Sequence, residues 1–419
     1  MNKLELGKRL FFEQEQISTG GESIENRDPF QRDRDRILHS RAFRRLMHKT
    51  QIFNANKGDH FRNRLTHTLE VSQIARSIGK VLGLDDELLE AISYGHDLGH
   101  TPFGHIGEKT LNKILKGEYI DRLSSENQRL FPQSGDNFKH NFQSLRVVDS
   151  LECRSEAYMG LNLTFAVREG ILKHTNKLMN IKYSDLNLEH MQIANEFSCT
   201  LEGQVVAISD EIAQCTHDLE DGVRSGIISI ADVEKNDLVK KIIDNYKLKE
   251  LNYNSKTPSL DIRINRIKFL VGYLINDVCI QSQTEIKKKL GDNNDFKAIY
   301  VTEKLVDFKS ETKELVRKLN EFITNSVIFS EDISIADAKS ENIIIQLFSA
   351  YYQTPRQLPD YILNRYFLKN GLDFNRLALK EDELKCDIRF VRLICDYLAG
   401  MTDQFASREY MRLYYPEYI

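Results

Sequence analysis

The sequence contains no tryptophan, little proline, and none of the cysteine patterns that define disulfide-rich or zinc-binding folds. Only 7 of its 419 residues are proline, so few positions interrupt a helix. The six cysteines are scattered without a CxxC pair, which argues against a disulfide framework and a zinc knuckle. These absences favour a helical protein without a cysteine-based scaffold.

Long hydrophobic runs and a large excess of either charge are also missing. The longest uncharged run, residues 342–355, is too short and too polar to span a bilayer, and residues 1–6 lack the apolar stretch of a signal peptide. The net charge of −4 argues against a protein that mainly coats nucleic acid. Because 41% of the residues are hydrophobic, a real core is available. We expect a soluble, cytoplasmic protein with no membrane partner.

Apolar residues recur at helical spacing along most of the chain, and no alternating strand pattern is present. Residues 65–82 predict one helix. Asp85 or Asp86 can cap a second helix that ends near His96, and residues 203–213 predict a third. We therefore expect an all-α fold.

Polar stretches that contain glycine or proline predict three loops, at residues 18–29, 116–137 and 252–258. The last loop suggests a division into two parts. Residues 1–250 would form a catalytic core with an arginine-rich N-terminal segment, and residues 251–419 a C-terminal helical region. A helical insertion would give the same pattern, so the alternative stays open.

Three of the 11 histidines lie within ten residues of one another, at His96, His100 and His105, beside Asp97 and three glycines. The expected helix ends at His96 and Asp97, after which the glycines and Pro102 require an irregular turn. Imidazole and carboxylate ligands together suit Mn, Fe, Co, Ni or Zn, and carboxylate with water suits Mg. This segment predicts part of a divalent metal site.

Further ligands are available on both sides of this segment. His67 lies upstream, and Asp210 lies in a mostly apolar run where an unpaired carboxylate would be costly. The alternative is that these are unrelated surface or core residues. A set of histidines and aspartates on helices around a glycine-rich turn favours the metal site.

The order of these residues resembles the HD-domain metal phosphohydrolases, and longer matches resemble their dNTP triphosphohydrolase (dGTPase-like) branch. The matches cover nearly the whole chain: Arg64–His67, His96–His105, His140–Arg146, Ile208–Ala213, Asp35–Leu46 and Ala399–Ala406. The resemblance implies an all-helical fold with an HD-domain core. It also implies hydrolysis of a dNTP to deoxynucleoside and tripolyphosphate, with one divalent metal held by His67, His96, Asp97 and Asp210.

The expected chemistry needs a proton donor, because a nucleoside 5′-oxygen is a poor leaving group. The family positions around the attacked phosphate correspond to His105, Glu108 and His140. We assign Glu108 and His140 as a proton-relay pair and His105 as a phosphate contact or acid. Each has a structural alternative: His105 could cap the turn, Glu108 could favour a helix start, and His140 could be exposed.

Four residues are expected to bind substrate. Arg64 lies one helical turn before His67 and would contact the α-phosphate, and His100 would support the turn or contact phosphate rather than bind metal. The resemblance implies that Gln51 and Asp218 read the sugar 3′-hydroxyl, although Asp218 could equally belong to a solvated acidic face. Where the family often has a tyrosine, this chain has Gln214.

Residues 27–64 contain eleven basic and four acidic residues, although the whole chain is slightly acidic. The alternating Arg and Asp at 32–36 could pair with one another in solvent, whereas Arg44 and Arg45 would bind substrate or a dNTP effector at a subunit interface. We expect a homo-oligomer and retain single-stranded DNA as a candidate partner. The rival functions are another HD phosphohydrolase (a 5′-nucleotidase or a guanosine-tetraphosphate hydrolase) and a nucleic-acid-binding regulator with a vestigial metal site.

Overall fold

The computed structural model describes residues 3–10, 27–53, 61–119, 136–156, 158–175, 183, 186, 188, 191, 195–246, 259–291 and 295–416, with the side chains of 259–266 left out. Over these residues the chain is helical, and it has isolated β-bridges but no strand. The all-α prediction is confirmed.

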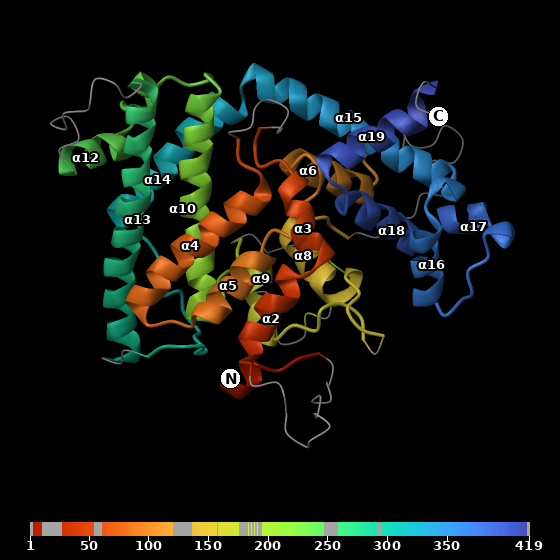
Figure 1. Cartoon of the computed structure of the whole chain (residues 1–419), viewed down its shortest axis with the longest axis horizontal. Coiled ribbons are helices and arrows are strands. Elements are labelled where there is room, and N and C mark those ends of the chain that lie inside the picture. Colours follow the sequence, from red (N-terminus) through yellow and green to blue (C-terminus); the bar gives the residue numbers. More distant parts are fainter. Residues whose placement is uncertain are drawn as a thin grey trace.

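Helices follow one another through the described residues, from the N-terminal part to the C-terminal part (Figure 1). The α-helices are α1 (Lys3–Leu6), α2 (Pro29–Leu38), α3 (Arg41–Arg45), α4 (Arg64–Leu82), α5 (Asp86–Gly95), α6 (His105–Leu115), α8 (His140–Arg146), α9 (Phe165–Lys173), α10 (Leu201–Arg224), α11 (Ile230–Val233), α12 (Asp237–Asn245), α13 (Ser259–Leu290), α14 (Ser310–Ile323), α15 (Glu331–Gln353), α16 (Asp360–Lys369), α17 (Glu381–Lys385), α18 (Ile388–Ala399) and α19 (Asp403–Tyr414). Short turns of other helix types are η1 (Leu46–His48), η3 (Val147–Leu151), η5 (Thr324–Ile328), η6 (Pro355–Gln357) and η7 (Arg376–Ala378).

The three helices predicted from periodicity are α4, α5 and α10, and each begins with a side-chain cap. The Asn63 side chain accepts a hydrogen bond from the first turn of α4, and α4 ends at Gly83, whose φ of 71° is left-handed. Asp85 caps α5 and Thr200 caps α10 in the same way. The cap of α4 lies one helical turn before His67, and the cap of α5 sets the start of the helix that ends at His96.

The larger hydrophobic core runs from Leu6 to Ile333 in the sequence and is built around α4, α5 and α10. Helices α2 and α9 pack against α5, and α13 packs against both α4 and α10. In Figure 1 the crossed helices α4 and α10 lie in the same half of the molecule as α13. This core therefore holds the helices that carry the candidate metal ligands.

A second core joins the C-terminal helices to α6. Leu111, Ile114 and Leu115 of α6 belong to one cluster with buried residues of α15, α16 and α18, and α6 packs directly against α15 and α18. In Figure 1, α15 extends from the half that contains α14 to the group formed by α16–α19. Helix α6 thus begins at His105, in the candidate site, and ends in the C-terminal core.

Much of the three predicted loops lies outside the described residues, as does the proposed division near residue 250, which stays a prediction. None of the described helices combines the length and the apolar character needed to cross a membrane.

A buried carboxylate connects the two cores. Asp396 of α18 accepts hydrogen bonds from the Arg146 guanidinium at 2.8–2.9 Å and from the Gln143 amide at 3.0 Å. Burial would raise the pKa of Asp396, but Arg146 and Arg392 hold it below its usual range. Asp396 is therefore ionised and paired, which is the condition for burying a charge at a tolerable cost.

We predict that Asp396→Ala lowers the free energy of unfolding by about 3–5 kcal/mol, because it removes the carboxylate that faces two buried guanidinium groups. Urea unfolding followed by circular dichroism measures the change. Asp382→Ala is the control, since Asp382 is fully exposed and pairs only loosely with Lys385 at 3.5 Å. Equal stabilities of the two variants would contradict the prediction.

Candidate functional site

Three separated helices bring His67, His96 and Asp210 together. The Nε2 atom of His67 lies 2.9 Å from Oδ1 of Asp210, and Nε2 of His96 lies 3.8 Å from the same oxygen. One ligand atom from each of the three lies within 4.8 Å of the other two. Imidazole nitrogens and a carboxylate at this separation form a donor set that a divalent transition metal can use.

The His96 ring is oriented as a metal ligand requires. It lies at the C-terminal end of α5, is fully buried, and donates from Nδ1 to the carbonyl oxygen of Ser93 at 2.6 Å. This hydrogen bond leaves Nε2 as the lone-pair nitrogen. Nε2 has no hydrogen-bond partner among the described residues. A buried acceptor without a partner is costly, so a cation fits this position.

Asp97 has one guanidinium and two imidazoles as partners. Its carboxylate accepts from the Arg64 guanidinium at 2.7 Å and contacts Nε2 of His100 at 3.1 Å and Nε2 of His96 at 3.5 Å. Burial would raise the pKa of Asp97, but His100, His96 and Arg64 together hold it well below its usual range. Asp97 is therefore a buried anion directly beside the His67–His96–Asp210 cluster.

The turn after Asp97 is shaped by the close approach of α8. A Cβ atom on Gly99 would lie 2.1 Å from the backbone nitrogen of Ser144, so only glycine fits there. The Ser144 hydroxyl donates to the carbonyl oxygen of His96 at 2.6 Å and accepts from the Gly99 backbone at 2.8 Å. These contacts place α8, and with it His140, against the turn.

Glu108 and His140 form the tightest polar pair of this region. One carboxylate oxygen of Glu108 lies 2.5 Å from His140 Nδ1 and 3.0 Å from the His140 backbone nitrogen. Burial would raise the pKa of Glu108, but His140 and His105 lower it to about 2. His140 is buried and stacks on His100 with ring centroids 4.0 Å apart, so the exposed alternative for His140 is wrong. His105 is exposed at the start of α6.

Two histidines in this cluster were not anticipated from the sequence. His174, at the C-terminal end of α9, lies with Nε2 3.2 Å from Nε2 of His140. His217 of α10 places Nδ1 3.3 Å from Nδ1 of His67 and pairs through Nε2 with Glu70 at 2.7 Å. His217 could have been found, because it follows Asp210 by seven residues and shares its helix face. The sequence around His174 gives only a weak indication of a functional residue, because His174 is simply a polar residue that follows a mostly buried helix.

The two residues expected to read the sugar each carry a buried oxygen without a partner among the described residues, Oε1 of Gln51 and Oδ1 of Asp218. Burial, Asp221 and Asp210 raise the pKa of Asp218 well above its usual range, which favours the protonated form of this side chain, a form that can donate a hydrogen bond. The alternative of a solvated acidic face is wrong, because residues 215–221 are buried. Gln214 is exposed.

The near-terminal motif at 399–406 is tied directly to the turn that follows Asp97. Lys49 is buried and donates to the carbonyl oxygens of His100 and Ala399. Asp403 accepts from the backbone nitrogens of Thr50 and Phe103, both at 2.8 Å. Two distant segments, residues 49–50 and 399–403, therefore hold the turn in place.

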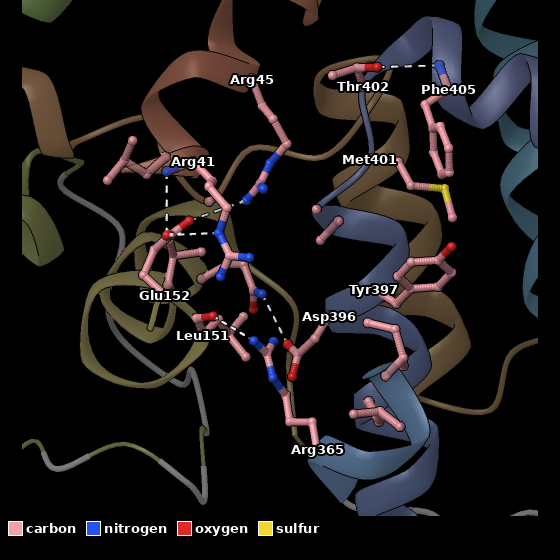
Figure 2. Close-up of a pocket in the computed structure, with 18 of the residues that line it drawn as sticks. Arg41, Arg45, Leu151, Glu152, Arg365, Asp396, Tyr397, Met401, Thr402 and Phe405 are labelled. Carbon is pink, nitrogen blue, oxygen red and sulfur yellow. Dashed lines mark hydrogen bonds and ion pairs between the residues drawn. The ribbon is translucent and has the colours of Figure 1, made fainter. Parts of the chain in front are cut away.

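A separate cavity of about 450 Å³ lies between these segments and is shown in Figure 2. Its walls include Arg41, Arg45, Arg365 and Arg408 together with aromatic side chains, and Gly99 contributes backbone to it. Glu152 faces Arg41 at 3.5 Å and Arg45 at 3.6 Å. We call this the arginine cavity. Arg44 is exposed and is not among its lining residues.

The alternating segment 32–36 is not a self-paired solvent face. Arg34 pairs with Asp35 but also reaches Glu90 at 3.0 Å. Asp33 is fully buried and pairs with Arg9, and Arg36 donates to the backbone at 161 and 162. These charges anchor the N-terminal part to the core.

Comparison with known proteins is in line with this geometry. Residues 64–214 match the HD domain, and residues 306–412 match the phosphohydrolase-associated domain. A deoxyguanosinetriphosphate triphosphohydrolase-like protein of Rickettsia typhi is 37% identical over 94% of this chain and 93% of its own length. The chain belongs to this HD-domain phosphohydrolase family. Proteins of the same printed name from Nitrosomonas europaea (37% identical, 93% of this chain, 91% of the relative) and Geobacter sulfurreducens (35%, 94% and 90%) are also similar.

HD domains bind divalent metal ions, and in this HD-domain phosphohydrolase the described side chains offer His and Asp clusters that can hold one. The donor set does not by itself select among the divalent metals. His67 and Asp210 lie at either end of the matched HD region, which explains why ligands so distant in sequence belong to one domain.

We predict that Asp210→Ala loses at least about 100-fold in affinity for a divalent metal, because it removes the carboxylate that faces both His67 and His96. Isothermal titration of the metal-free protein with Mn²⁺ measures the affinity, and circular dichroism checks that the helices remain. The control is Glu211→Ala, which removes an exposed carboxylate from the next position of the same helix. Unchanged Mn²⁺ affinity in Asp210→Ala would remove this residue from the metal site.

Proposed function

We propose that this HD-domain phosphohydrolase hydrolyses a deoxynucleoside triphosphate, dGTP or another dNTP, to deoxynucleoside and tripolyphosphate. The proposed metal ligands are His67, His96, Asp97 and Asp210. The main support is the convergence of His67, His96 and Asp210 beside the buried Arg64–Asp97 pair. The similarity to proteins named as dGTP triphosphohydrolase-like supports the nucleotide substrate.

A divalent cation at these ligands would supply Lewis acidity and a water of lowered pKa. Arg64 keeps its Nε without a partner among the described residues while one end of its guanidinium holds Asp97. A guanidinium has five donors in a planar fork, so Arg64 can also bind an α-phosphate oxygen. His100 donates to Asp97 and keeps that carboxylate in place.

The proposed position of bond cleavage follows from the groups beside this phosphate. His105, Glu108 and His140 lie with His100 in one cluster whose ligand atoms are within 4.8 Å of each other. The leaving 5′-oxygen needs a proton, and these three residues are the candidate donors. Gln51 and Asp218 would fix the sugar through its 3′-hydroxyl, and crowding at the 2′ position would disfavour ribonucleotides.

The arginine cavity is our candidate for the dNTP effector site, since four arginines and only two carboxylates, Glu152 and Asp396, line it and leave an excess of positive charge. Arg45 supports this assignment, because its buried Nε has no partner among the described residues. Homo-oligomer formation and binding of single-stranded DNA stay predictions. The rival HD phosphohydrolase activities differ in the phosphate species they release, and a vestigial regulator would release none.

We predict that Arg64→Lys lowers kcat/KM by about 10- to 100-fold, corresponding to about 1.4–2.7 kcal/mol, because lysine keeps the charge but loses the planar fork. Steady-state assays with dGTP measure the effect, and thermal unfolding checks the fold. Arg76→Lys on the same helix is the matched control, since Arg76 is half exposed. An unchanged kcat/KM for Arg64→Lys would exclude a fork-dependent phosphate contact.

The product assay is the test of the proposed function. Incubation with each dNTP, singly and in pairs, should release deoxynucleoside and intact tripolyphosphate without dNMP or dNDP, as resolved by ion-exchange chromatography. Turnover only with a pair of dNTPs would indicate activation by an effector. Pyrophosphate plus dNMP as first products would overturn the triphosphohydrolase proposal and leave the metal site standing.

A further inference from the structure

His174 is held in the same way as His96. Each ring lies at the C-terminal end of a helix and donates from Nδ1 to the carbonyl oxygen three residues earlier, Ser93 for His96 at 2.6 Å and Ile171 for His174 at 2.7 Å. A carbonyl oxygen can only accept, so Nδ1 carries the proton and Nε2 of the neutral ring carries the lone pair. The two rings meet edge to face, with centroids 5.1 Å apart.

His140 presents its Nε2 to the same place. Its Nδ1 donates to the Glu108 carboxylate at 2.5 Å, which is the arrangement of a metal-binding histidine supported by a carboxylate. Its Nε2 lies 3.2 Å from Nε2 of His174. With both rings neutral, two lone pairs would face each other at this distance and repel, so either a shared proton or a metal cation lies between them.

The spacing suits a metal ion as the intervening cation. Zinc-like ions bind imidazole nitrogen at about 2.0–2.1 Å, so two neighbouring ligands at about 90–110° stand roughly 2.8–3.4 Å apart. A third ligand is present, since an oxygen of Asp97 lies within 4.8 Å of both nitrogens. The three side chains are all buried.

We propose that Asp97, His140 and His174 form a second divalent-cation site, which shares the Asp97 carboxylate with the site formed by His67, His96 and Asp210. Asp97 has two oxygens and lies 3.5 Å from His96, so it can serve both sites. The second site takes a borderline divalent ion such as Mn²⁺, Fe²⁺, Co²⁺ or Zn²⁺, because two of its three ligands are imidazoles.

This inference also deepens the proposed function, on which the following point rests. A cation bound to Nε2 of His140 leaves that atom without a proton to give. His105, exposed at the start of α6, is then the proton donor to the leaving oxygen, and Glu108 orients His140.

The test is the number of ions bound by the full-length protein. Protein stripped with a chelator is equilibrated with Mn²⁺, and bound manganese per chain is measured by mass spectrometry after gel filtration. We expect two ions per wild-type chain, one per His174→Ala chain, and two per chain of the control His48→Ala, which removes an exposed histidine outside the cluster. The electron paramagnetic resonance spectrum of the wild type should show two coupled Mn²⁺ ions, and His174→Ala should lose the coupling.

One ion per wild-type chain would overturn the inference, since a shared proton would then hold the two histidines together. Two ions in both the wild type and His174→Ala would also overturn it, by placing the second ion elsewhere. If His174→Ala fails to fold, the wild-type count and its spectrum still decide. Two ions without dNTP hydrolysis would overturn the proposed function alone, and hydrolysis with a single ion would overturn this inference alone.

Discussion

The buried carboxylate of Asp97 is the constraint on which the rest of the structure depends. An ionised group can remain buried only if opposite charge and hydrogen bonds replace the water it loses. Arg64 and His100 provide these partners at 2.7 and 3.1 Å. To bring them there, α4 must begin at Arg64, α5 must end beside it, and the chain must turn back at once, which is what the caps at Asn63 and Asp85 and the close approach at Gly99 achieve.

The helical class and the placement of most candidate ligands follow from sequence alone, because periodicity, caps and the glycine-rich turn are local signals. His67 and His96 lie where those signals put them, on α4 and at the end of α5. His174 could not be placed in this way. Its role depends on the distance to His140, which is set by how α8 and α9 pack and is not encoded in any short segment.

The number of charged residues in a segment likewise does not predict whether their side chains are buried. The acidic run after Thr216 has the composition of a solvent-facing surface, yet it is buried because Arg62 pairs with Glu220 and Asp221 from across the fold. The arginine-rich segment contains the opposite case, since Asp33 and Arg36 are buried for structural reasons while Arg45 lines a cavity. Pairing between distant residues decides which charges are available to a ligand, and such pairing is visible only in the folded chain.

The contacts of Lys49 and Asp403 have a consequence for how this molecule can be divided. Every proposed metal ligand lies before residue 215, so a fragment that ends near residue 300 would contain the complete ligand set. That fragment would nevertheless lack the carbonyl oxygen of Ala399, which binds Lys49, and the carboxylate of Asp403, which binds the backbone of Thr50 and Phe103. These contacts hold the turn after Asp97. The C-terminal helices therefore act as a brace for the HD domain. A change in how those helices pack would reach the turn at His100 through a single side chain, since Lys49 binds the carbonyl oxygens of both His100 and Ala399.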